Sequence, residues 1–406
     1  MKKCIFMIIL TVLSIHIYAE GYQVNVQSQK NTAMGHTGTG LLLGTSSIHF
    51  NPGALGFMQK DFEFSFGGTA VFSKVSYSQK GSNYQSETDS PIGTPFYAYA
   101  AKKINEKLVL GIGLTTPYGN SLAWEDDWAG RYLIQNISLS AIVAQPTLSY
   151  RLSDKWGIGI GAMVVFGSVD LNRALPVDGT VPGSVSMEGS TTALGFNVGA
   201  FFKASPQLSL GLNYRSKVTM EMEGGDADFT VPSALRIYFP SGNKFDAELP
   251  LPANLTLGVG YQINDKVTLA ADFQYVFWDA YKELYFDFET NTSLLADSPN
   301  PRNYENTLIY RLGAEYKQSE NLILRAGIYF DETPVSEDYL NPETPGMNKI
   351  GMSTGASYML NDKLTVDLSL LFIVGLDRDA SYLPANFSGT YDSQAFLPGV
   401  GLTYSF

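Results

Sequence analysis

The stretch INDKVTLAADFQYVFW, residues 263 to 278, joins a polar turn to an alternating strand. Apolar side chains recur at every second position from Val267 to Phe277, while Thr268, Asp272 and Gln274 lie between them. A period of two is typical of a β-strand with one apolar face. This stretch therefore predicts a strand that is entered through a tight turn and buries one face.

Five further copies of the polar step follow the same plan. Each lies between two alternating runs, which indicates a tight hairpin. The copies are INEKLVLG at 104, LSDKWGIG at 152 and LNDKLTVD at 360, with looser versions SPQLSLG at 205 and SENLILR at 319. Longer polar segments separate the hairpins.

Counting both kinds of connection predicts fourteen strands. They cover residues 61–78, 93–104, 107–117, 138–152, 155–172, 189–204, 207–222, 247–263, 266–285, 303–318, 321–332, 347–361, 363–376 and 394–406. An even strand count with short turns on one side and long loops on the other is typical of an outer-membrane barrel. We therefore expect an all-β, 14-stranded antiparallel transmembrane β-barrel over residues 61–406, with both chain ends on the periplasmic side.

Composition supports strands that face lipid. Hydrophobic residues make up 45% of the chain and charged residues only 16%, against roughly 25% charged in soluble domains. In NLILRAGIYF the alternation places Arg325 opposite the apolar face, inside the lumen. A charge facing lipid would cost roughly 2–4 kcal/mol, which fixes this orientation. A secreted β-sandwich or propeller is the soluble alternative.

The chain start is interpreted as a secretory signal peptide over residues 1–19. Lys2 and Lys3 precede an apolar run to about residue 17, and Ala19 offers a cleavage site. The single cysteine, Cys4, lies in this segment. Residues 20–60 are rich in glycine and hydroxyl side chains and do not form a strand pattern, so we expect them to form an N-terminal hatch inside the lumen.

Several long segments resemble one known family. They are GYQVNVQSQKNTAMGHTGTG from 21, HFNPGAL from 49, LTTPYGNSLAWEDDWAGRY from 114, LPLPANLTLGVGYQINDKVTLAADFQYVFW from 249 and RLGAEYKQSENLILRAGIYFDETPV from 311. Together they resemble the outer-membrane long-chain fatty-acid transporters of the FadL/TodX type, which include importers of aromatic hydrocarbons. The resemblance implies a hatch, a capture groove in the outer loops, an inner pocket, and a kink in the third strand that opens the wall sideways.

The resemblance gives two sets of candidate residues in the hatch and the third strand. Asn51-Pro52-Gly53 matches the family's Asn-Pro-Ala motif except at Gly53, and the resemblance places it against the inner pocket; an ordinary turn is the alternative. Gly111 and Gly113 weaken the third strand and Pro117 lies at its expected end. These three residues mark either the lateral opening or a simple bend.

The head group of a fatty acid needs a cation. The alternation along the fifth strand places Arg173 on the lumen side, and the family carries a basic residue at the matched position. A guanidinium can hold a carboxylate through two parallel hydrogen bonds. Pairing with Asp170 or with another loop acid is the alternative. A second basic position of the family matches Glu305 here, and the nearby Arg302 is a candidate replacement.

An outer loop carries grouped aromatic residues. Trp124, Trp128 and Tyr132 are candidate ligand-binding residues because exposed apolar rings can capture a hydrophobic molecule. The acids between them, residues 125–127, could bind a divalent cation that bridges lipopolysaccharide, but a solvated loop is the preferred interpretation. We expect no metal site in the chain.

Catalysis finds little support in the sequence. After the expected signal peptide the only histidines are His36 and His49, and no nucleotide-binding or hydrolase motif follows a suitable pattern. We expect no enzyme activity and no cofactor. The net charge of −12 argues against nucleic acid as a partner.

The function predicted from the sequence is passive uptake of hydrophobic compounds across the outer membrane. Long-chain fatty acids are the first candidate, and an importer of aromatic hydrocarbons or a general porin are the alternatives. The expected partners are a hydrophobic small molecule and outer-membrane lipid, and the expected state is a monomer.

Overall fold

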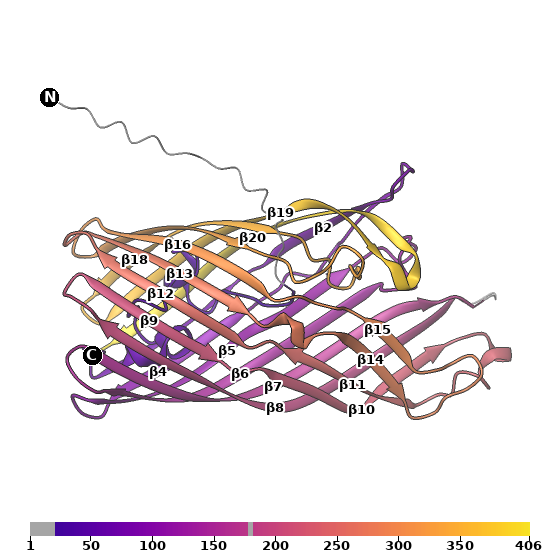
Figure 1. Cartoon of the computed structure of the whole chain (residues 1–406), viewed down its shortest axis with the longest axis horizontal. Helices are drawn as coiled ribbons and strands as arrows, with labels where there is room; N and C mark the ends of the chain where they lie inside the picture. Colours follow the sequence, from indigo (N-terminus) through magenta and orange to yellow (C-terminus); the bar gives the residue numbers. More distant parts are fainter. Residues whose placement is uncertain (1–20, 178–181) are drawn as a thin grey trace.

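A single closed sheet surrounds the lumen (Figure 1). The computed structural model describes residues 21–177 and 182–406, so the expected signal peptide, residues 1–19, lies outside the described residues. β1 (Phe62–Thr69) pairs with β4 (Phe96–Lys103) on one side and with β20 (Phe387–Ser405) on the other. The last strand thus closes on the first, and the prediction of an antiparallel 14-stranded barrel is confirmed.

The barrel strands are longer and more often interrupted than the sequence predicted. Their outer ends extend furthest, because a strand that has left the lipid no longer needs apolar residues at every second position. In chain order the strands are β1 with β2 (Phe72–Ser78), β3 (Gln85–Glu87) with β4, β5 (Leu108–Ala123), β6 (Asn136–Arg151), β7 (Trp156–Leu175), β8 (Gly183–Lys203), β9 (Leu208–Arg215) with β10 (Val218–Thr230), β11 (Asn243–Leu251) with β12 (Asn254–Gln262), β13 (Val267–Val276) with β14 (Glu283–Phe288), β15 (Ser298–Pro301) with β16 (Thr307–Lys317), β17 (Leu322–Asp331), β18 (Lys349–Asn361), β19 (Leu364–Tyr382) and β20. Short 3-10 turns η1 (Ser233–Leu235), η2 (Trp278–Ala280) and η3 (Leu383–Ala385) interrupt the outer connections.

All six short turns share one hydrogen-bond pattern, in which a side-chain oxygen accepts two backbone N–H groups. In the turn before β13, the Asn264 side-chain oxygen accepts the backbone N–H of Lys266 at 2.9 Å and of Val267 at 3.0 Å. Asn105 and Asn361 repeat this arrangement, and the Ser153, Ser205 and Ser319 hydroxyls do so in the other three turns. A short polar side chain at the first turn position therefore explains why the sequence repeats Asn or Ser there.

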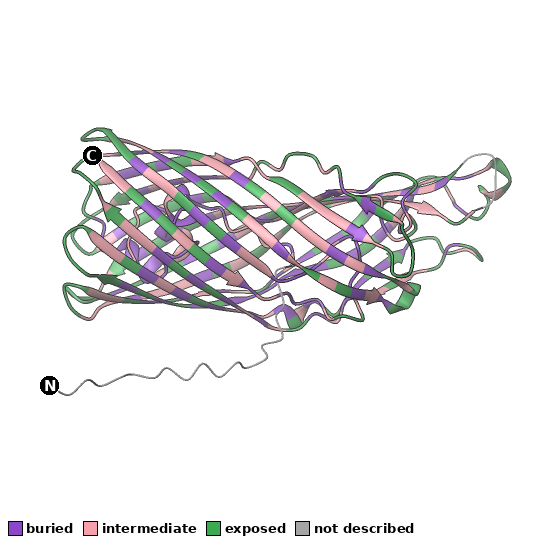
Figure 2. Cartoon of the chain, turned by 90° about the horizontal axis from the view of Figure 1, so that it is seen from above, coloured by how far each residue is buried: buried purple, intermediate pink, exposed green. Residues whose placement is uncertain are grey.

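Burial alternates along the strands, as the diagonal bands in Figure 2 show. In β13, Leu269 is 42% exposed on the outer face, whereas Asp272 is 5% exposed inside. Arg325 is likewise buried inside, where it pairs with Glu315 at 2.8 Å. The predicted inward position of this cation is confirmed. Within the described ranges, no helix is long and apolar enough to cross a membrane.

The N-terminal hatch fills the end of the lumen next to the short turns (Figure 1). It carries three one-turn helices, α1 (Gln29–Thr32), α2 (Ser47–Phe50) and α3 (Pro52–Leu55). Wall glycines allow its backbone to lie directly on the sheet. A Cβ atom at Gly211 would overlap the Thr39 carbonyl oxygen, and one at Gly327 would overlap the backbone of Gly35. Asp272 adds two hydrogen bonds of 2.9 Å, accepted from the N–H groups of Gly38 and Thr39.

We expect Gly211→Ala to displace the hatch without opening the barrel. The added methyl group requires the Thr39 segment to move, and overpacking of this kind costs roughly 1–3 kcal/mol. Liposome swelling with small sugars should be slow for the wild type and faster for the variant. Gly68→Ala is the matched control, because a Cβ there would lie 3.7 Å from its nearest neighbour. Equal swelling rates for the two variants would contradict the close hatch contact.

Candidate functional site

The third barrel strand, β5, is irregular in its middle. Its register with β6 shifts between Thr115 and Tyr118, at Pro117. Gly111 and Gly113 lie before this bulge and keep regular partners in both neighbouring strands. Pro117 was expected at the strand end, but β5 continues to Ala123, so that boundary was wrong. Gly111 makes room for the hatch, since a Cβ there would lie 2.7 Å from the Ile48 side chain. A Cβ at Gly113 would lie 2.9 Å from the Tyr99 ring of β4 and 3.1 Å from Ile48.

Above the bulge β5 loses its neighbour on one side. Pairing with β4 ends at Thr115, because β4 begins only at Phe96. The chain start supplies a partial replacement from inside the lumen. Val24 N–H donates to the Pro117 carbonyl at 2.9 Å, and Gly119 N–H donates to the Tyr22 carbonyl at 3.0 Å. Residues 22–24, called here the N-terminal bridge, thus satisfy part of an otherwise unpaired strand edge.

A cavity of about 560 Å³ lies beside this bridge and is called here the wall cavity. Leu139 and Leu371 line it from the inner face of the barrel. Ile142 also lines it, although it alternates with the inward and buried Ala141 and Val143 and therefore belongs to the outer face. Residues 91–96 complete the lining on the side of β4. The wall cavity therefore reaches through the sheet between β4 and β5.

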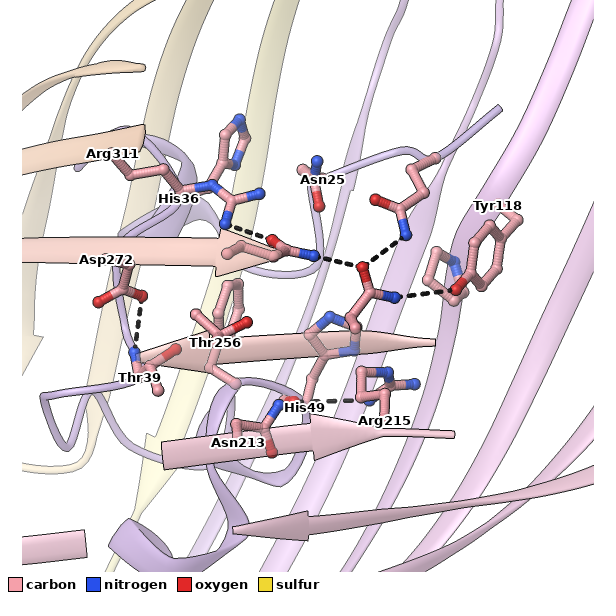
Figure 3. Close-up of a pocket in the computed structure, with 15 residues that line it drawn as sticks. Asn25, His36, Thr39, His49, Tyr118, Asn213, Arg215, Thr256, Asp272 and Arg311 are labelled. Carbon is pink, nitrogen blue, oxygen red and sulfur yellow. Dashed lines mark hydrogen bonds between the residues drawn. The ribbon is translucent and has the colours of Figure 1, made fainter. Parts of the chain in front are cut away.

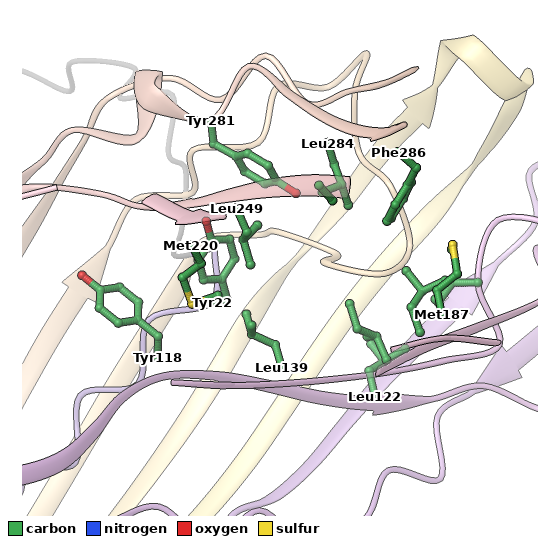
Figure 4. Close-up of a cluster of buried hydrophobic side chains, with 14 of the residues drawn as sticks. Tyr22, Tyr118, Leu122, Leu139, Met187, Met220, Leu249, Tyr281, Leu284 and Phe286 are labelled. Carbon is green, nitrogen blue, oxygen red and sulfur yellow. The ribbon is translucent and has the colours of Figure 1, made fainter. Parts of the chain in front are cut away.

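A second, narrow cavity of about 30 Å³ lies among apolar side chains in the outer half of the lumen (Figure 4). We call it the apolar cavity. It shares Asn120 and Leu139 with the wall cavity. Its lining comprises Tyr22, Asn120, Ile137, Leu139, Val169, Leu171, Met187, Met222, Phe245, Leu249, Tyr281, Leu284, Phe286, Glu343 and Thr344.

The Tyr22 ring lines the apolar cavity and makes close aromatic contacts there. It packs edge-on against Trp278, with ring centroids 5.0 Å apart and an interplanar angle of 84°, and against Tyr281 at 5.9 Å. Its hydroxyl donates to the Pro250 carbonyl oxygen. Gly21 permits this packing, since a Cβ there would lie 2.7 Å from the Trp278 ring. The N-terminal bridge therefore separates the apolar cavity from the wall cavity.

A polar cluster lies between the bridge and the hatch (Figure 3). Arg311 donates to the Gln274 amide oxygen, and Gln274 in turn donates to Asn254 at 2.5 Å. The hatch residues His36 and His49 also line this cluster. Burial, and then nearby arginine charges, lower their pKa well below the usual value, so both imidazoles are neutral at pH 7. The cluster makes the lumen polar next to the hatch, and this region is called here the lumen floor.

Arg173 lies on β7, close in sequence to the apolar cavity residue Leu171 but not among the residues that line the cavity. It pairs across the sheet with the buried Val185, two residues beyond the cavity residue Leu171. Within the described residues it makes no ion pair with Asp170, whose carboxylate instead accepts from Asn172 at 2.9 Å. Its Nε has no hydrogen-bond partner, and the nearest acid whose charge acts on it is Glu343.

Arg302 does not offer a free guanidinium. It is 1% exposed and forms an ion pair with Glu343, which is 5% exposed. Its second terminal nitrogen lies 3.3 Å from the Tyr382 hydroxyl, to which it donates. Glu305 is exposed. Arg302, the candidate for a second head-group residue, is therefore already paired with the carboxylate of Glu343.

The motif Asn51-Pro52-Gly53 anchors the hatch to the wall. The Asn51 amide donates to the carbonyls of Thr39 at 2.8 Å and Ala200 at 3.0 Å, and its oxygen accepts Gly53 N–H at 3.0 Å. A Cβ at Gly53 would lie 2.8 Å from the Gly199 carbonyl, which explains the glycine. The motif lines neither the apolar cavity nor the wall cavity, and its place against the inner pocket stays a prediction.

The loop aromatics differ in exposure. Trp124 and Trp128 are buried and stacked, with centroids 4.2 Å apart, so their expected exposure as a capture surface was wrong. Trp124 donates its indole N–H to the Pro342 carbonyl at 3.1 Å. Tyr132 is exposed, with the Arg131 guanidinium 4.5 Å above its ring. The tryptophans therefore hold the outer loops together, because stacked indoles bury a large apolar area.

Sequence reasoning missed the N-terminal bridge and Glu343. The alternation of Tyr22, Val24 and Val26 is a short extended pattern that could have revealed the bridge. Glu343 lies in a long irregular loop and gave no signal. Among the described residues no group of three or more metal-ligating side chains could hold a metal ion.

Comparison with known proteins agrees with this geometry. The family model described as "Outer membrane protein transport protein (OMPP1/FadL/TodX)" matches residues 10–406. The chain is similar to the outer membrane protein P1 of Haemophilus influenzae, with 23% identity over 96% of this chain and 95% of the relative. It is also similar to the long-chain fatty acid transport protein of Salmonella typhi, with 20% identity over 100% and 98%.

Two solved structures share the fold. A Pseudomonas aeruginosa FadL homologue superposes with a TM-score of 0.84 at 18% identity, covering 95% of this chain and 100% of the homologue. The toluene transporter TodX of P. putida superposes with a TM-score of 0.74 at 18% identity, covering 96% and 99%. Since the family model covers almost the whole chain and the closed barrel has the same fold, the chain belongs to the OMPP1/FadL/TodX family of outer-membrane proteins that transport hydrophobic compounds.

Proposed function

We propose that this protein takes up hydrophobic molecules passively and releases them sideways into the outer membrane. A molecule would leave the outer loops for the apolar cavity, pass the N-terminal bridge, and enter the wall cavity between β4 and β5. The observation that carries this proposal is that Leu139 from the inner face and Ile142 from the outer face line the same cavity. The bulge at Pro117 is the local reason that the wall has a passage there.

The lumen floor supports a sideways route over a straight one. Burial of an apolar chain contributes roughly 0.8 kcal/mol per methylene group. A molecule that continued toward the short turns would lose this contribution among buried Arg215, Arg311 and Asp272 and would have to displace the hatch. The bridge, in contrast, is held to β5 by the hydrogen bonds of Val24 and Gly119. Moving the N-terminal bridge is therefore a smaller rearrangement than displacing the hatch.

Two classes of cargo fit the site. Long-chain fatty acids are the first, because Arg173, two residues beyond the cavity residue Leu171, has an unpartnered Nε. Uncharged hydrocarbons are the second, because Glu343 already neutralises Arg302 and the Tyr22 ring shows that an aromatic group packs well between Trp278 and Tyr281. Relatives named for each class belong to the same family.

Other roles fit less well. A general porin needs an open aqueous lumen, whereas the hatch here packs directly on the wall glycines. The described strands close into one sheet, which supports a monomer. No arrangement of the cavity residues supports catalysis, so we propose transport as the sole activity of this site.

We expect Ser121→Trp to slow transport at the wall. Ser121 lines the wall cavity, and an indole there fills the passage without touching the apolar cavity. Uptake of a radiolabelled hydrophobic compound by cells should fall by about tenfold, while its binding to the purified protein stays within about twofold. Thr354→Trp, on the exposed face of β18 and away from this cavity, is the control. Unchanged uptake by Ser121→Trp would rule out the sideways route.

We expect Arg173→Ala to weaken binding of oleate by about tenfold and to leave binding of toluene unchanged. A charge-assisted hydrogen bond to a carboxylate accounts for a loss of this size, and toluene makes no such bond. Titration in detergent with tryptophan fluorescence as the readout measures both ligands. If oleate binds equally well to the variant, the fatty-acid candidate loses its head-group residue.

A further inference from the structure

Glu343 is an unusual residue for the place where it lies. Of the described residues that line the apolar cavity, it is the only one with a formal charge at pH 7. It belongs to residues 332–348, called here the strap, which connect β17 to β18 and fold into the outer lumen. Strap residues such as Leu340 and Met347 are completely buried. Glu343 is thus carried into the lumen by its own loop.

The strap is fixed on both sides of Glu343. Asn120 of β5 donates its side-chain amide to the Glu343 carbonyl at 2.8 Å. Trp124 donates to the preceding carbonyl of Pro342, and the Thr344 hydroxyl lies 2.9 Å from that of Tyr304. With three consecutive residues held in this way, the Glu343 carboxylate cannot swing away from the cavity without breaking several contacts.

Two guanidinium groups depend on this one carboxylate. Arg302 contacts it directly and is almost completely buried. Arg173 lies farther away, and the charge of Glu343 is the main favourable acid charge acting on it. The carboxylate therefore stands where the head group of an ionised ligand would have to lie to reach Arg302.

We propose that Glu343 is a specificity-determining residue, which acts as a built-in carboxylate in the head-group position and shifts the preference of the apolar cavity toward uncharged ligands. This inference rests on the proposed transport of hydrophobic molecules through that cavity. An ionised fatty acid would bring a second carboxylate beside the first, and like charges repel strongly where water is excluded. The attraction of Arg173 and the repulsion of Glu343 then oppose each other.

An uncharged polar group suits the same place better. A hydroxyl can donate a hydrogen bond to a carboxylate, whereas a second carboxylate can only accept. A phenol that lines the cavity has this chemistry, since the uncharged Tyr22 hydroxyl donates to the Pro250 carbonyl oxygen. Alcohols and hydrocarbons with an apolar tail are therefore the favoured class.

The test compares dodecanoate with dodecan-1-ol, which share a chain length and differ in charge at pH 7.5. Binding to the purified full-length mature protein in detergent is measured by titration. We expect the wild type to bind the alcohol at least as tightly as the acid. In Glu343→Gln we expect dodecanoate to bind about tenfold more tightly, because the repelling charge is gone and Arg302 is released, while the alcohol changes by less than about threefold.

A second variant protects the test against misfolding. Glu343→Gln leaves Arg302 buried without a counter-charge, which can destabilise a protein. The double variant Glu343→Met with Arg302→Met removes both charges at similar volume, an exchange that proteins often tolerate. It should also shift the ratio of acid to alcohol binding toward the acid, through Arg173.

The outcomes separate the two proposals. If the wild type binds neither ligand, the proposed function fails together with the inference that rests on it. If the wild type binds both but prefers dodecanoate by more than about tenfold, the proposed function stands and the role of Glu343 is overturned. The same conclusion follows if neither variant changes the ratio of acid to alcohol binding.

Discussion

A strand inside a bilayer must have its backbone N–H and C=O groups paired, because lipid offers no hydrogen bonds. This barrel meets that requirement through antiparallel pairing along most of its described strands, but above the bulge of β5 the pairing with β4 stops at Thr115. The N-terminal bridge covers part of that edge from inside, through the carbonyls of Pro117 and Tyr22. This weakly paired edge of β5 is thus covered by the N-terminal bridge, which lies inside the lumen and is not a strand of the barrel wall.

The lumen explains why this weak part is suited to be an exit. Glycines on the inner face let the hatch backbone lie against the sheet, and buried arginines with Asp272 make the floor polar. The outer half of the lumen is apolar and adjoins the wall cavity at Asn120 and Leu139. An apolar molecule therefore meets a favourable environment in the outer half and beside β5, and an unfavourable one below.

Sequence reasoning predicted the barrel well, and it predicted the site less well. Alternation and the six polar turns follow from local rules, since lipid requires an apolar face and the turns need Asn or Ser to accept two N–H groups. The burial of Trp124 and the pairing of Arg302 with Glu343 depend on loops that meet only in the folded chain. Periodicity contains no information about such contacts. Nor could it show that Asn51, which the resemblance placed against the inner pocket, anchors the hatch to the wall.

Photo-crosslinking during transport tests the central claim most directly. A dodecanol that carries a diazirine near the end of its chain would be supplied to cells, irradiated during uptake, and located on the protein by mass spectrometry. A sideways route predicts labels in residues 91–96 and 116–121 and on Ile142, which line the wall cavity. Labels confined to the floor and the hatch, in residues 36–50, would show that the molecule passes straight through the lumen and would contradict the account.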